Sequence, residues 1–195
     1  MEVKLVLTED GSHTLAVPGL DEHYHSIYGA VSESQYIFIN AGLLNIIPAK
    51  KAISILEIGF GTGLNALLTL HELSGKNIYC EYDAIELNPV PEEIYTALNY
   101  PEILGIPAGI FHSLHNCKWN KKISISDVFS LHKILASAME MQLKKSHYDL
   151  VYFDAFGPNK QPEMWSEEIF KKIYNSMKTG RILTTYSTKG NVKRI

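Results

Sequence analysis

The sequence is poor in cysteine: only Cys80 and Cys117 occur among its 195 residues, and their spacing matches no metal-binding motif. Two cysteines also provide no disulfide framework, which is typical of proteins from a reducing compartment. No apolar stretch is long enough to span a bilayer, and the first ten residues lack the layout of a signal peptide. We therefore expect a cytoplasmic protein that binds no metal and no membrane.

An excess of positive charge is also missing, since 18 lysines and arginines stand against 21 acidic residues and give a formal net charge of −3. Nucleic-acid-binding domains usually carry a basic surface, so this balance argues weakly against an RNA partner. Lysine clusters remain at 121–122, 144–145, 171–172 and 189–194, and each is equally explained as a solvated surface.

What the sequence does contain is an ordinary globular composition, with 46% hydrophobic and 20% charged residues, enough for one sizeable core. Residues 3–17 predict a β-hairpin around a turn signal at 9–12. Residues 32–47 have a helical pattern, with core contacts at Ile37, Leu43, Leu44 and Ile47, and Pro48 ends it. We expect residues 1–50 to pack as an extension on the same domain as residues 51–195.

Beyond residue 50 the sequence alternates between short apolar runs and helical patterns. It predicts strands at 52–58, 77–87, 148–154 and 181–188, and helices at 64–73, 91–99 and 166–180, the last running from Ser166 as N-cap to Gly180. Residues 123–126 and 129–135 form either a strand pair or one interrupted strand, and 100–122 show no regular pattern. This order predicts an α/β sandwich with a mostly parallel sheet.

The stretch LEIGFGTGLNALL at 56–68 places three glycines, Gly59, Gly61 and Gly63, between a predicted strand and a predicted helix. Their spacing is G-x-G-x-G, so the dinucleotide pattern G-x-G-x-x-G is not met. We expect Glu57 to face the ligand from the strand's carboxyl end, where it would repel a pyrophosphate and suit the cationic S-adenosylmethionine. Glu86 ends the next strand, where an acid can accept hydrogen bonds from ribose hydroxyls. A plain turn beside two surface glutamates is the alternative interpretation.

The run YDLVYFDAFGPNKQPEMW at 148–165 is the second informative stretch. We expect Asp149 to face solvent at the start of the strand. Asp154 follows the strand at the sheet's carboxyl edge, where a carboxylate can accept a hydrogen bond from a substrate amine. A loop-ordering or helix-capping aspartate is the alternative. Phe156 is expected to stack on a base, Pro158 to stiffen the loop, and Lys160 to meet a phosphate or solvent.

Several of these segments together resemble the methyltransferase domain of the MnmC-type tRNA 5-methylaminomethyl-2-thiouridine methyltransferases. They are GFGTGLNALL, IELNP, YFDAFGPNKQPEMWSEEIF, TTYSTKGNVKR and, near the N-terminus, DEHYHSIYGAVSESQYIF. The resemblance implies a Rossmann-like methyltransferase sandwich. It also implies S-adenosylmethionine-dependent N-methylation of an aminomethyl group on the wobble uridine of tRNA, by a stand-alone form without the flavin oxidoreductase domain of larger members.

The resemblance also implies roles for individual residues. It assigns Glu57, Gly59, Gly61, Gly63 and Asn65 to the methionine end of the cofactor, and Glu86 to its ribose. It places Asp154 and Phe156 at the target amine, with Tyr24, Glu33 and Ser34 lining the approach.

The sequence departs from the family at two places. Ser137 stands where the family has an acidic residue near the adenine, which leaves the adenine contact undefined. The chain also ends shortly after the fifth strand, so we expect the C-terminal strands of the fold to be missing. The sheet edge would then be covered by a partner or by a second copy of the chain.

Other functions remain open at this point. Aminopropyl transfer of the polyamine-synthase kind also uses a glycine loop, a ribose-binding acid and an aspartate after an apolar strand, although its aspartate-rich signature is not apparent. A methyltransferase fold that binds RNA or a partner without turnover is a third possibility, suggested by Ser137 and the shortened C-terminus. A dinucleotide-dependent oxidoreductase is disfavoured by the glycine spacing and by Glu57.

Overall fold

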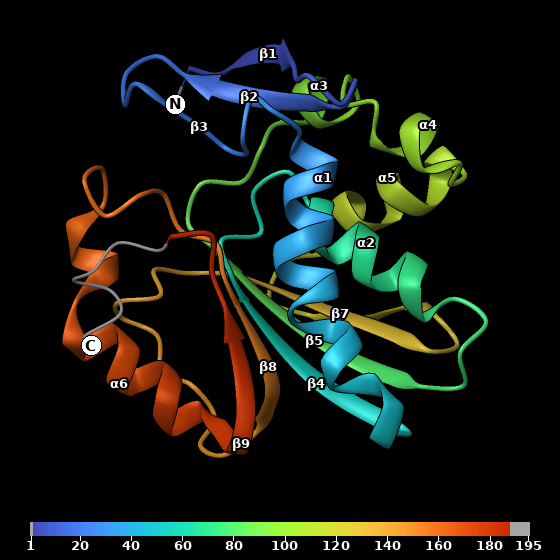
Figure 1. The fold of residues 1–195 in the computed structure, drawn as a ribbon, viewed down its shortest axis with the longest axis vertical. Helices are drawn as coiled ribbons and strands as arrows, with labels where there is room; N and C mark the ends of the chain where they lie inside the picture. The colour runs from blue at the N-terminus through green and yellow to red at the C-terminus, as the bar shows by residue number, and fades with distance from the viewer. Residues whose placement is uncertain (1, 188–195) are drawn as a thin grey trace.

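A six-stranded sheet forms the centre of the computed structural model, which describes residues 2–187 (Figure 1). The strand order is β6-β7-β5-β4-β8-β9. The parallel strands are β4 (Ala52–Ile58), β5 (Tyr79–Glu86), β7 (Phe129–Leu135), β8 (Tyr148–Phe153) and β9 (Met177–Thr184), while β6 (Lys122–Ser126) runs antiparallel to β7. The predicted α/β class with a mostly parallel sheet is confirmed.

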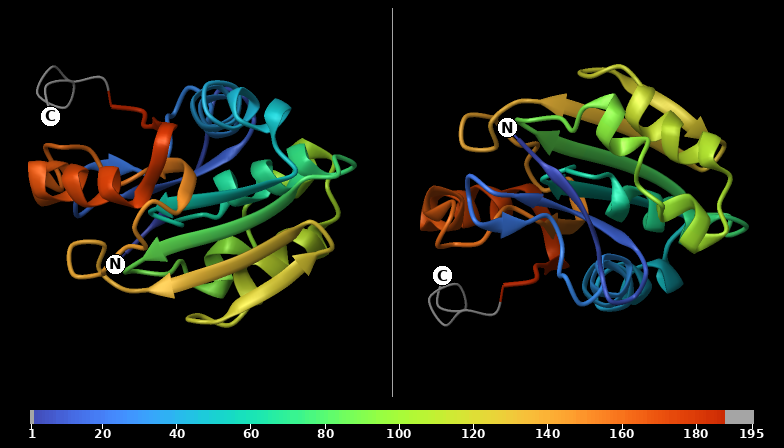
Figure 2. Two further views of the ribbon diagram at one scale, coloured as in Figure 1. Left: turned by 90° about the horizontal axis from the view of Figure 1, so that it is seen from below. Right: turned by 90° about the horizontal axis from the view of Figure 1, so that it is seen from above.

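Helices cover both faces of this sheet (Figures 1 and 2). One face packs against α2 (Leu64–Leu73), α5 (Ala108–Asn116) and the N-terminal α1 (Ala30–Ser34), and the other packs against α6 (Glu167–Ser176). Alternation along the strands supplies both cores: Ile55 of β4 faces the first, and its neighbours Leu56 and Ile58 face the second. Glu57 is two residues after Ile55 on the same strand, so its side chain points into the same core as Ile55, beneath α2.

The N-terminal residues form a small antiparallel sheet of β1 (Lys4–Leu7), β2 (His13–Val17) and β3 (Glu22–His23). The predicted hairpin at 3–17 is confirmed, with Lys4 opposite Ala16. The carboxylate of Asp10 accepts hydrogen bonds from the backbone N–H groups of Ser12 in the turn and Ser32 in α1, at 3.0 and 2.9 Å. These bonds tie the hairpin to α1, and the small sheet lies above the carboxyl ends of the central strands (Figure 1).

The strand at 52–58 and the helix at 64–73 match the prediction residue for residue. The N-cap at Ser166 is also confirmed, since its side chain accepts a hydrogen bond from the N–H of Ile169. Residues 122–135 form a strand pair and not one interrupted strand, the two alternatives that the sequence left open. The pair has a register shift between Ser124 and Ser126.

The helix predicted at 32–47 is wrong in detail. Helix α1 begins at Ala30, continues as a π-helix over Gln35–Asn40, and gives way to two short 3₁₀ helices, Leu43–Asn45 and Ile47–Ala49. Leu44 is exposed, whereas Leu43 and Ile47 are buried as expected, because the change of pitch rotates the apolar positions away from a regular 3.6-residue period.

The helices between residues 91 and 122 were not predicted correctly, because two prolines interrupt the helical pattern of the sequence. The helix predicted at 91–99 is shorter, α3 (Glu92–Tyr95), and the segment without a pattern contains α4 (Tyr100–Leu104) and α5. Pro101 lies in the first turn of α4, and Pro107 is the N-cap of α5, positions where proline is tolerated. From the sequence alone, the same prolines indicate helix ends, and no helix is predicted there.

The C-terminal helix also ends earlier than predicted. Helix α6 stops at Ser176, and β9 begins at Met177, so Gly180 lies within the strand instead of at the helix end. Its positive φ of 70° belongs to a bulge where the pairing shifts from Tyr148–Met177 to Leu150–Ile182. The lysine cluster at 189–194 and the last residue of the predicted strand lie outside the described residues. The covering of β9 by a partner stays a prediction.

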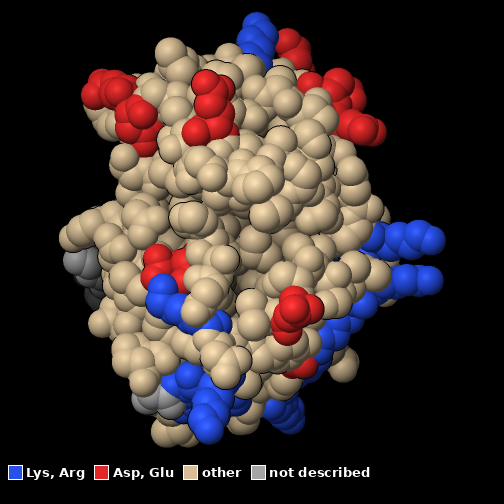
Figure 3. Space-filling view, turned by 90° about the vertical axis from the view of Figure 1, so that its right-hand side faces the viewer, with Lys and Arg blue, Asp and Glu red and all other residues tan. Residues whose placement is uncertain are grey.

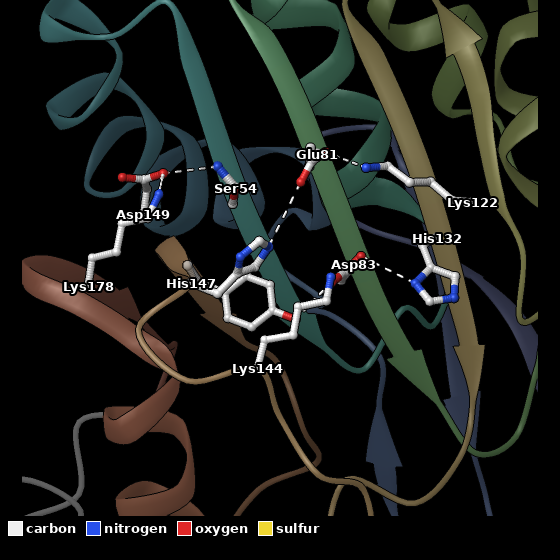
Figure 4. Close-up of polar contacts among 10 residues, drawn as sticks. Ser54, Glu81, Asp83, Lys122, His132, Lys144, His147, Asp149 and Lys178 are labelled. Atoms are coloured by element: carbon white, nitrogen blue, oxygen red, sulfur yellow. Dashed lines mark hydrogen bonds and ion pairs between the residues drawn. The ribbon is translucent and has the colours of Figure 1, made fainter.

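Asp149 does not face solvent, which corrects the prediction from its place at the strand's start. Its side chain is 1% exposed and forms ion pairs with Lys50, Lys178 and Arg181 at 3.2, 2.7 and 3.3 Å. Figure 4 shows the pair with Lys178. The backbone N–H of Ser54 donates a further bond of 3.1 Å. Three cations, Lys50 before β4 and Lys178 and Arg181 of β9, make this burial favourable, and no local sequence pattern reveals them.

A second polar group lies on the same face of the sheet, around two acidic residues of β5 (Figure 4). Glu81 pairs with Lys122 and lies 3.8 Å from His147. Asp83 accepts bonds of 2.8 Å from Lys144 and 2.7 Å from the Tyr148 hydroxyl, and it lies 3.3 Å from His132. The Lys144 contact ties the loop between β7 and β8 to the sheet.

Candidate active site

A cavity opens at the carboxyl ends of β4, β5 and β8, below the N-terminal sheet. The glycine loop after β4, Glu86 at the end of β5 and Asp154 after β8 form its base, and Tyr24 and His25 close it from above. The remaining wall comes from the residues after β7 and from the loop after β8: Ala136, Ser137, Ala138, Ala155, Phe156, Gln161 and Met164, with Tyr186. Parallel α/β sheets bind ligands at this edge.

The glycine loop approaches its neighbours too closely for side chains. Gly59 has a φ of 93°, and a Cβ there would lie 2.6 Å from the carbonyl oxygen of Asp154. At Gly61, with a φ of 49°, a Cβ would lie 3.1 Å from the Tyr24 ring. The N–H groups of Gly59, Phe60, Gly61 and Gly63 donate within the protein, so the N–H groups left for a ligand are those of the first turn of α2.

Two neutral histidines hold the loop at Thr62. The Nε2 atom of His25 lies 2.9 Å from the Thr62 hydroxyl, and the Nε2–H of His115 donates to the Thr62 carbonyl at 3.0 Å. Burial lowers the pKa of His25 to about 4 and that of His115 to about 3, so neither ring brings a positive charge at neutral pH. Sequence reasoning missed this contribution, because single histidines carry no motif.

Glu86 is fixed at the cavity wall by the backbone. Its carboxylate accepts hydrogen bonds from the N–H of Gly61 at 2.9 Å and from the N–H of Asn88 at 2.7 Å. Burial raises its pKa, against the lowering effect of these bonds. The predicted ribose contact is thus presented by a carboxylate whose direction is set by the glycine loop itself.

Asp154 lies in the cavity wall with one oxygen engaged. The amide nitrogen of Asn65 donates to its Oδ2 at 2.8 Å, and its backbone N–H donates to the Ile58 carbonyl at 2.9 Å. Burial raises the pKa of Asp154 to about 7, with a smaller contribution from the nearby charge of Glu33. A carboxyl group that titrates near neutrality and faces a cavity is suited to proton transfer.

The loop after β8 is ordered by hydrogen bonds to its backbone. The Tyr186 hydroxyl donates to the Ala155 carbonyl and the Trp165 indole to the Phe156 carbonyl, both at 2.8 Å. The Phe156 ring meets Tyr24 edge to face, with ring centroids 5.2 Å apart. Tyr24 and Phe156 therefore form an apolar wall of the cavity that Asp154 also lines. Their predicted roles, Phe156 at the target amine and Tyr24 on the approach, stay predictions.

Several predicted site residues do not line the cavity: Glu57, Gly63, Glu33, Ser34, Pro158 and Lys160. Glu57 and Ser34 are completely buried. Glu33 accepts a bond of 2.6 Å from the N–H of Ser26, and Lys160 lies 3.7 Å from Asp21. Their functional roles stay predictions. Ser137, in contrast, lines the cavity on the side of β7.

The cavity suits a cationic nucleoside. Among its described lining residues the ionisable acids are Glu86 and Asp154, and neither lysine nor arginine occurs there. An unbalanced pair of carboxylates favours positive groups such as an ammonium or a sulfonium and disfavours a pyrophosphate. The residues present therefore fit S-adenosylmethionine. No cluster of three metal-ligating side chains is found within residues 2–187.

Comparisons with known proteins agree with this geometry. Residues 109–195 match the sequence profile of a family described as S-adenosyl-L-methionine-dependent methyltransferase. The crystal structure of MNMC2 from Aquifex aeolicus is 28% identical and superposes with a TM-score of 0.81, over 99% of this chain and 62% of that chain.

Curated relatives give the same result. The tRNA 5-methylaminomethyl-2-thiouridine biosynthesis bifunctional protein MnmC of Paraburkholderia xenovorans is 24% identical over 98% of this chain and 31% of its own length. An uncharacterized protein, MJ0670 of Methanocaldococcus jannaschii, is 28% identical over 94% of this chain and 50% of its own. The chain thus spans about a third of the bifunctional relative.

These findings agree with the resemblance to the MnmC methyltransferase domain, and the family that residues 109–195 match is described as S-adenosyl-L-methionine-dependent. The described residues contain no helix with the length and apolarity needed to cross a membrane.

Proposed function

We propose that this chain methylates the amino group of an aminomethyl substituent on a modified wobble uridine of tRNA, in the cytoplasm. The observation that carries the proposal is the placement of Asp154. This carboxyl group titrates near neutrality and lies between the glycine loop and an aromatic wall, in a cavity whose described lining lacks lysine and arginine. The similarity to MnmC proteins supplies tRNA as the substrate class.

The cofactor would be held by backbone and carboxylate groups of this chain. Glu86 would accept the ribose hydroxyls, and the backbone of Gly59 and Gly61 would border the methionine end. Ser137 and its neighbours would border the adenine. When bound, S-adenosylmethionine supplies an electrophilic methyl group on a sulfonium.

Asp154 would accept the proton that the substrate amine must lose before methyl transfer. A primary alkylamine is mostly protonated at neutral pH and cannot act as a nucleophile until a base removes a proton. Asn65 engages Oδ2, so we assign proton acceptance to Oδ1, which leaves the amine lone pair free. The ammonium favours the ionised carboxylate, and the pKa near 7 lets Asp154 take up and release the proton at neutral pH.

The aromatic wall positions the substrate and excludes water. Tyr24 and Phe156 present ring surface beside Asp154, and the loop that carries Phe156 is fixed by Trp165 and Tyr186. A pyrimidine ring placed on this wall would bring its aminomethyl substituent to the carboxylate. Methyl transfer depends mainly on such alignment.

Aminopropyl transfer is the second candidate, because the same glycine loop and ribose acid would serve it. The comparisons favour methyl transfer instead. Calorimetry with S-adenosylmethionine, its decarboxylated form and NADH separates the classes. We expect S-adenosylmethionine to bind best, and tight binding of NADH alone would falsify the proposal, as would preference for the decarboxylated form.

Methyl transfer to tRNA carrying an aminomethyl wobble uridine then tests the substrate. We expect methyl incorporation into this tRNA and none into the same transcript without the aminomethyl group. Glu86→Gln should weaken cofactor binding about tenfold through a lost charged hydrogen-bond acceptor, whereas the exposed Glu93→Gln should not. Cofactor binding without methylation of any tRNA would support the non-catalytic interpretation.

A further inference from the structure

A buried lysine, Lys133, lies beside the glycine loop and has no part in the proposed mechanism. It extends from β7 on the same face of the strand as Phe129 and Leu131, which belong to the core beneath α2, and it is 1% exposed. None of the ion pairs formed among residues 2–187 includes it. A buried cation without a carboxylate partner is costly, so other groups must stabilise the ammonium.

Three neighbouring groups stabilise it. The Nζ atom donates a hydrogen bond to the carbonyl of His115, which lies in the last turn of α5. It also lies over two aromatic rings, 4.6 Å from the centroid of Trp119 and 5.5 Å from the centroid of Phe60. Helix C-termini and aromatic faces both attract cations. The neighbouring Cys117 supplies no negative charge, because burial raises the pKa of its thiol.

Two of these three groups belong to the cofactor side of the cavity. Phe60 is part of the glycine loop and lines the cavity. His115 donates to the Thr62 carbonyl at 3.0 Å, and a Cβ on Gly63 would lie 2.9 Å from the same Nε2 atom. The rings of Phe60 and His115 meet edge to face, with centroids 5.3 Å apart. The Lys133 ammonium therefore contacts both residues that support the loop from the side of α5.

Trp119 is fixed in a different way. The backbone N–H of its neighbour Asn120 donates to the Lys133 carbonyl at 2.7 Å, and the Asn120 side chain accepts a bond of 3.0 Å from the N–H of Leu135. These bonds use the backbone of β7 and do not involve the ammonium. Loss of the charge alone would thus leave Trp119 in place and act on Phe60 and on the end of α5.

We propose that Lys133 is a positioning residue of the cofactor site, whose ammonium holds the Phe60 ring and the C-terminal end of α5 against the glycine loop. The loop leads directly into the first turn of α2, whose N–H groups are left for a ligand. A shift of Phe60 would move this backbone relative to the cofactor. No motif in the sequence indicates the role, because a single lysine within an apolar strand has no characteristic spacing. The inference rests on the proposed place of the cofactor at the glycine loop.

Two substitutions test whether the charge has this role. Lys133→Met keeps the apolar stem and removes the charge and the donors, whereas Lys133→Arg keeps both. For Lys133→Met we expect calorimetry to give a dissociation constant for S-adenosylmethionine about tenfold higher than that of the parent. Its kcat for methylation at saturating cofactor should stay within about threefold, because the substrate side of the cavity is not changed. Lys133→Arg should restore the affinity to within about threefold of the parent.

The matched control is Lys121→Met, which changes an exposed lysine just before β6 and should leave both constants unchanged. Circular dichroism establishes that each variant is folded. Lys133→Gln replaces Lys133→Met if the latter is not native, and it should weaken cofactor binding about fivefold or more, since it lacks the cation over Phe60. A dissociation constant within about twofold of the parent for the folded neutral variant overturns the proposal, as does equal weakening by the neutral variant and by Lys133→Arg.

A double-mutant cycle tests the path through Phe60. Phe60→Leu removes the ring over which Nζ lies, so the combined variant with Lys133→Met should bind the cofactor within about twofold of the weaker single variant. Effects that multiply would show that the two residues act separately and would overturn the proposal. All these binding constants are measured without tRNA. A parent that binds S-adenosylmethionine but methylates no tRNA rejects the proposed function alone, and normal binding by Lys133→Met beside an active parent rejects this inference alone.

Discussion

At the scale of single residues, Asp154 controls the pH dependence of the proposed reaction. Its pKa of about 7 is raised, so the fraction of the required carboxylate increases with pH through that value. We expect kcat/KM to decrease as the pH falls below this pKa. Asp154→Asn should lower kcat/KM by about 100-fold or more above this pKa, because the proton acceptor is lost, and by less in acid, where Asp154 of the parent is protonated too. Rates of methyl transfer between about pH 5 and about pH 9 measure both effects.

The matched control for this substitution is Asp127→Asn, which changes an exposed aspartate in the turn between β6 and β7. It should leave the pH profile unchanged. Cofactor binding by Asp154→Asn should stay within about fivefold of the parent, a difference near ~1 kcal/mol. A normal methylation rate from Asp154→Asn would remove the role assigned to Asp154.

The same substitution should stabilise the protein. A carboxyl group whose folded pKa lies above its unfolded value binds its proton more strongly in the folded state. The resulting stability is present below the unfolded value of 3.8 and is lost as pH rises through about 7. An asparagine side chain does not titrate, so Asp154→Asn should gain in melting temperature relative to the parent between these two values and keep the gain at higher pH. A melting temperature difference that is the same at about pH 4 and at about pH 8 would contradict this account.

At the scale of elements, the glycine loop joins β4 to α2 and carries the cofactor side of the cavity. Gly59→Ala places a Cβ against the backbone of Asp154 and also meets the strain of a positive φ. We expect a loss of about 3 kcal/mol in the free energy of unfolding and a cofactor affinity lower by about tenfold or more. Chemical denaturation measures the free energy of unfolding, and calorimetry measures the cofactor affinity.

Gly75→Ala is the matched control, because Gly75 has a similar φ of 75° and no atom within 4 Å of the added Cβ. It isolates the conformational cost, about 1 kcal/mol, and should leave cofactor affinity unchanged. Equal effects of the two substitutions would mean that the close approach to Asp154 has no energetic role.

The ion pairs of Asp149 connect the beginnings of β4, β8 and β9. Burial alone would raise the pKa of Asp149, but hydrogen bonds from Lys178, Ser54 and Lys50 lower it. Its contribution to stability is therefore present above the unfolded pKa and is lost as pH falls through the folded one. Asp149→Asn should cost about 3 kcal/mol at neutral pH and less in acid. Urea unfolding at several pH values tests this, and a pH-independent cost would contradict it.

The sequence allowed correct prediction where local patterns determine the structure. The strand at 52–58, the helix at 64–73 and the cap at Ser166 follow from apolar periodicity and capping alone. Positions that depend on distant partners were not predictable. Asp149 is buried because cations from β9 and from the residues before β4 surround it, and Gly180 lies in a bulge whose register is set by β8.

The site shows the same division. Glu86 and Asp154 both line the cavity, because one ends and the other follows a strand and the carboxyl ends of these strands meet at one edge; their roles stay predictions. The histidines that hold Thr62 come from the bend after β3 and from α5, a helix that the sequence pattern did not predict. The direction of Glu57 depends on side-chain alternation within β4, which turns it toward the core shortly before the loop begins.

At the scale of the whole molecule, the charge distribution limits how the proposed tRNA substrate would bind. On the face in Figure 3, most lysine and arginine side chains lie in the middle and lower part, and acidic side chains gather at the upper edge. The upper part contains the N-terminal sheet (Figure 1), and Tyr24 and His25, which follow this sheet, line the cavity. With a net charge of −3, the protein has few cations to spread over an RNA backbone. Recognition should therefore depend on the modified base more than on phosphates.

This argument predicts a weak salt dependence of tRNA binding. Each phosphate neutralised by a cation adds to the slope of log Kd against log salt, so a slope of about 2 is expected, well below the value of about 10 of strongly basic binders. Raising sodium chloride from about 50 to about 200 mM should weaken binding less than removal of the aminomethyl group from the wobble uridine does. Fluorescence anisotropy with both tRNAs measures these effects. A slope steeper than about 5, equal for the two tRNAs, would show that phosphate contacts dominate and that the base contributes little.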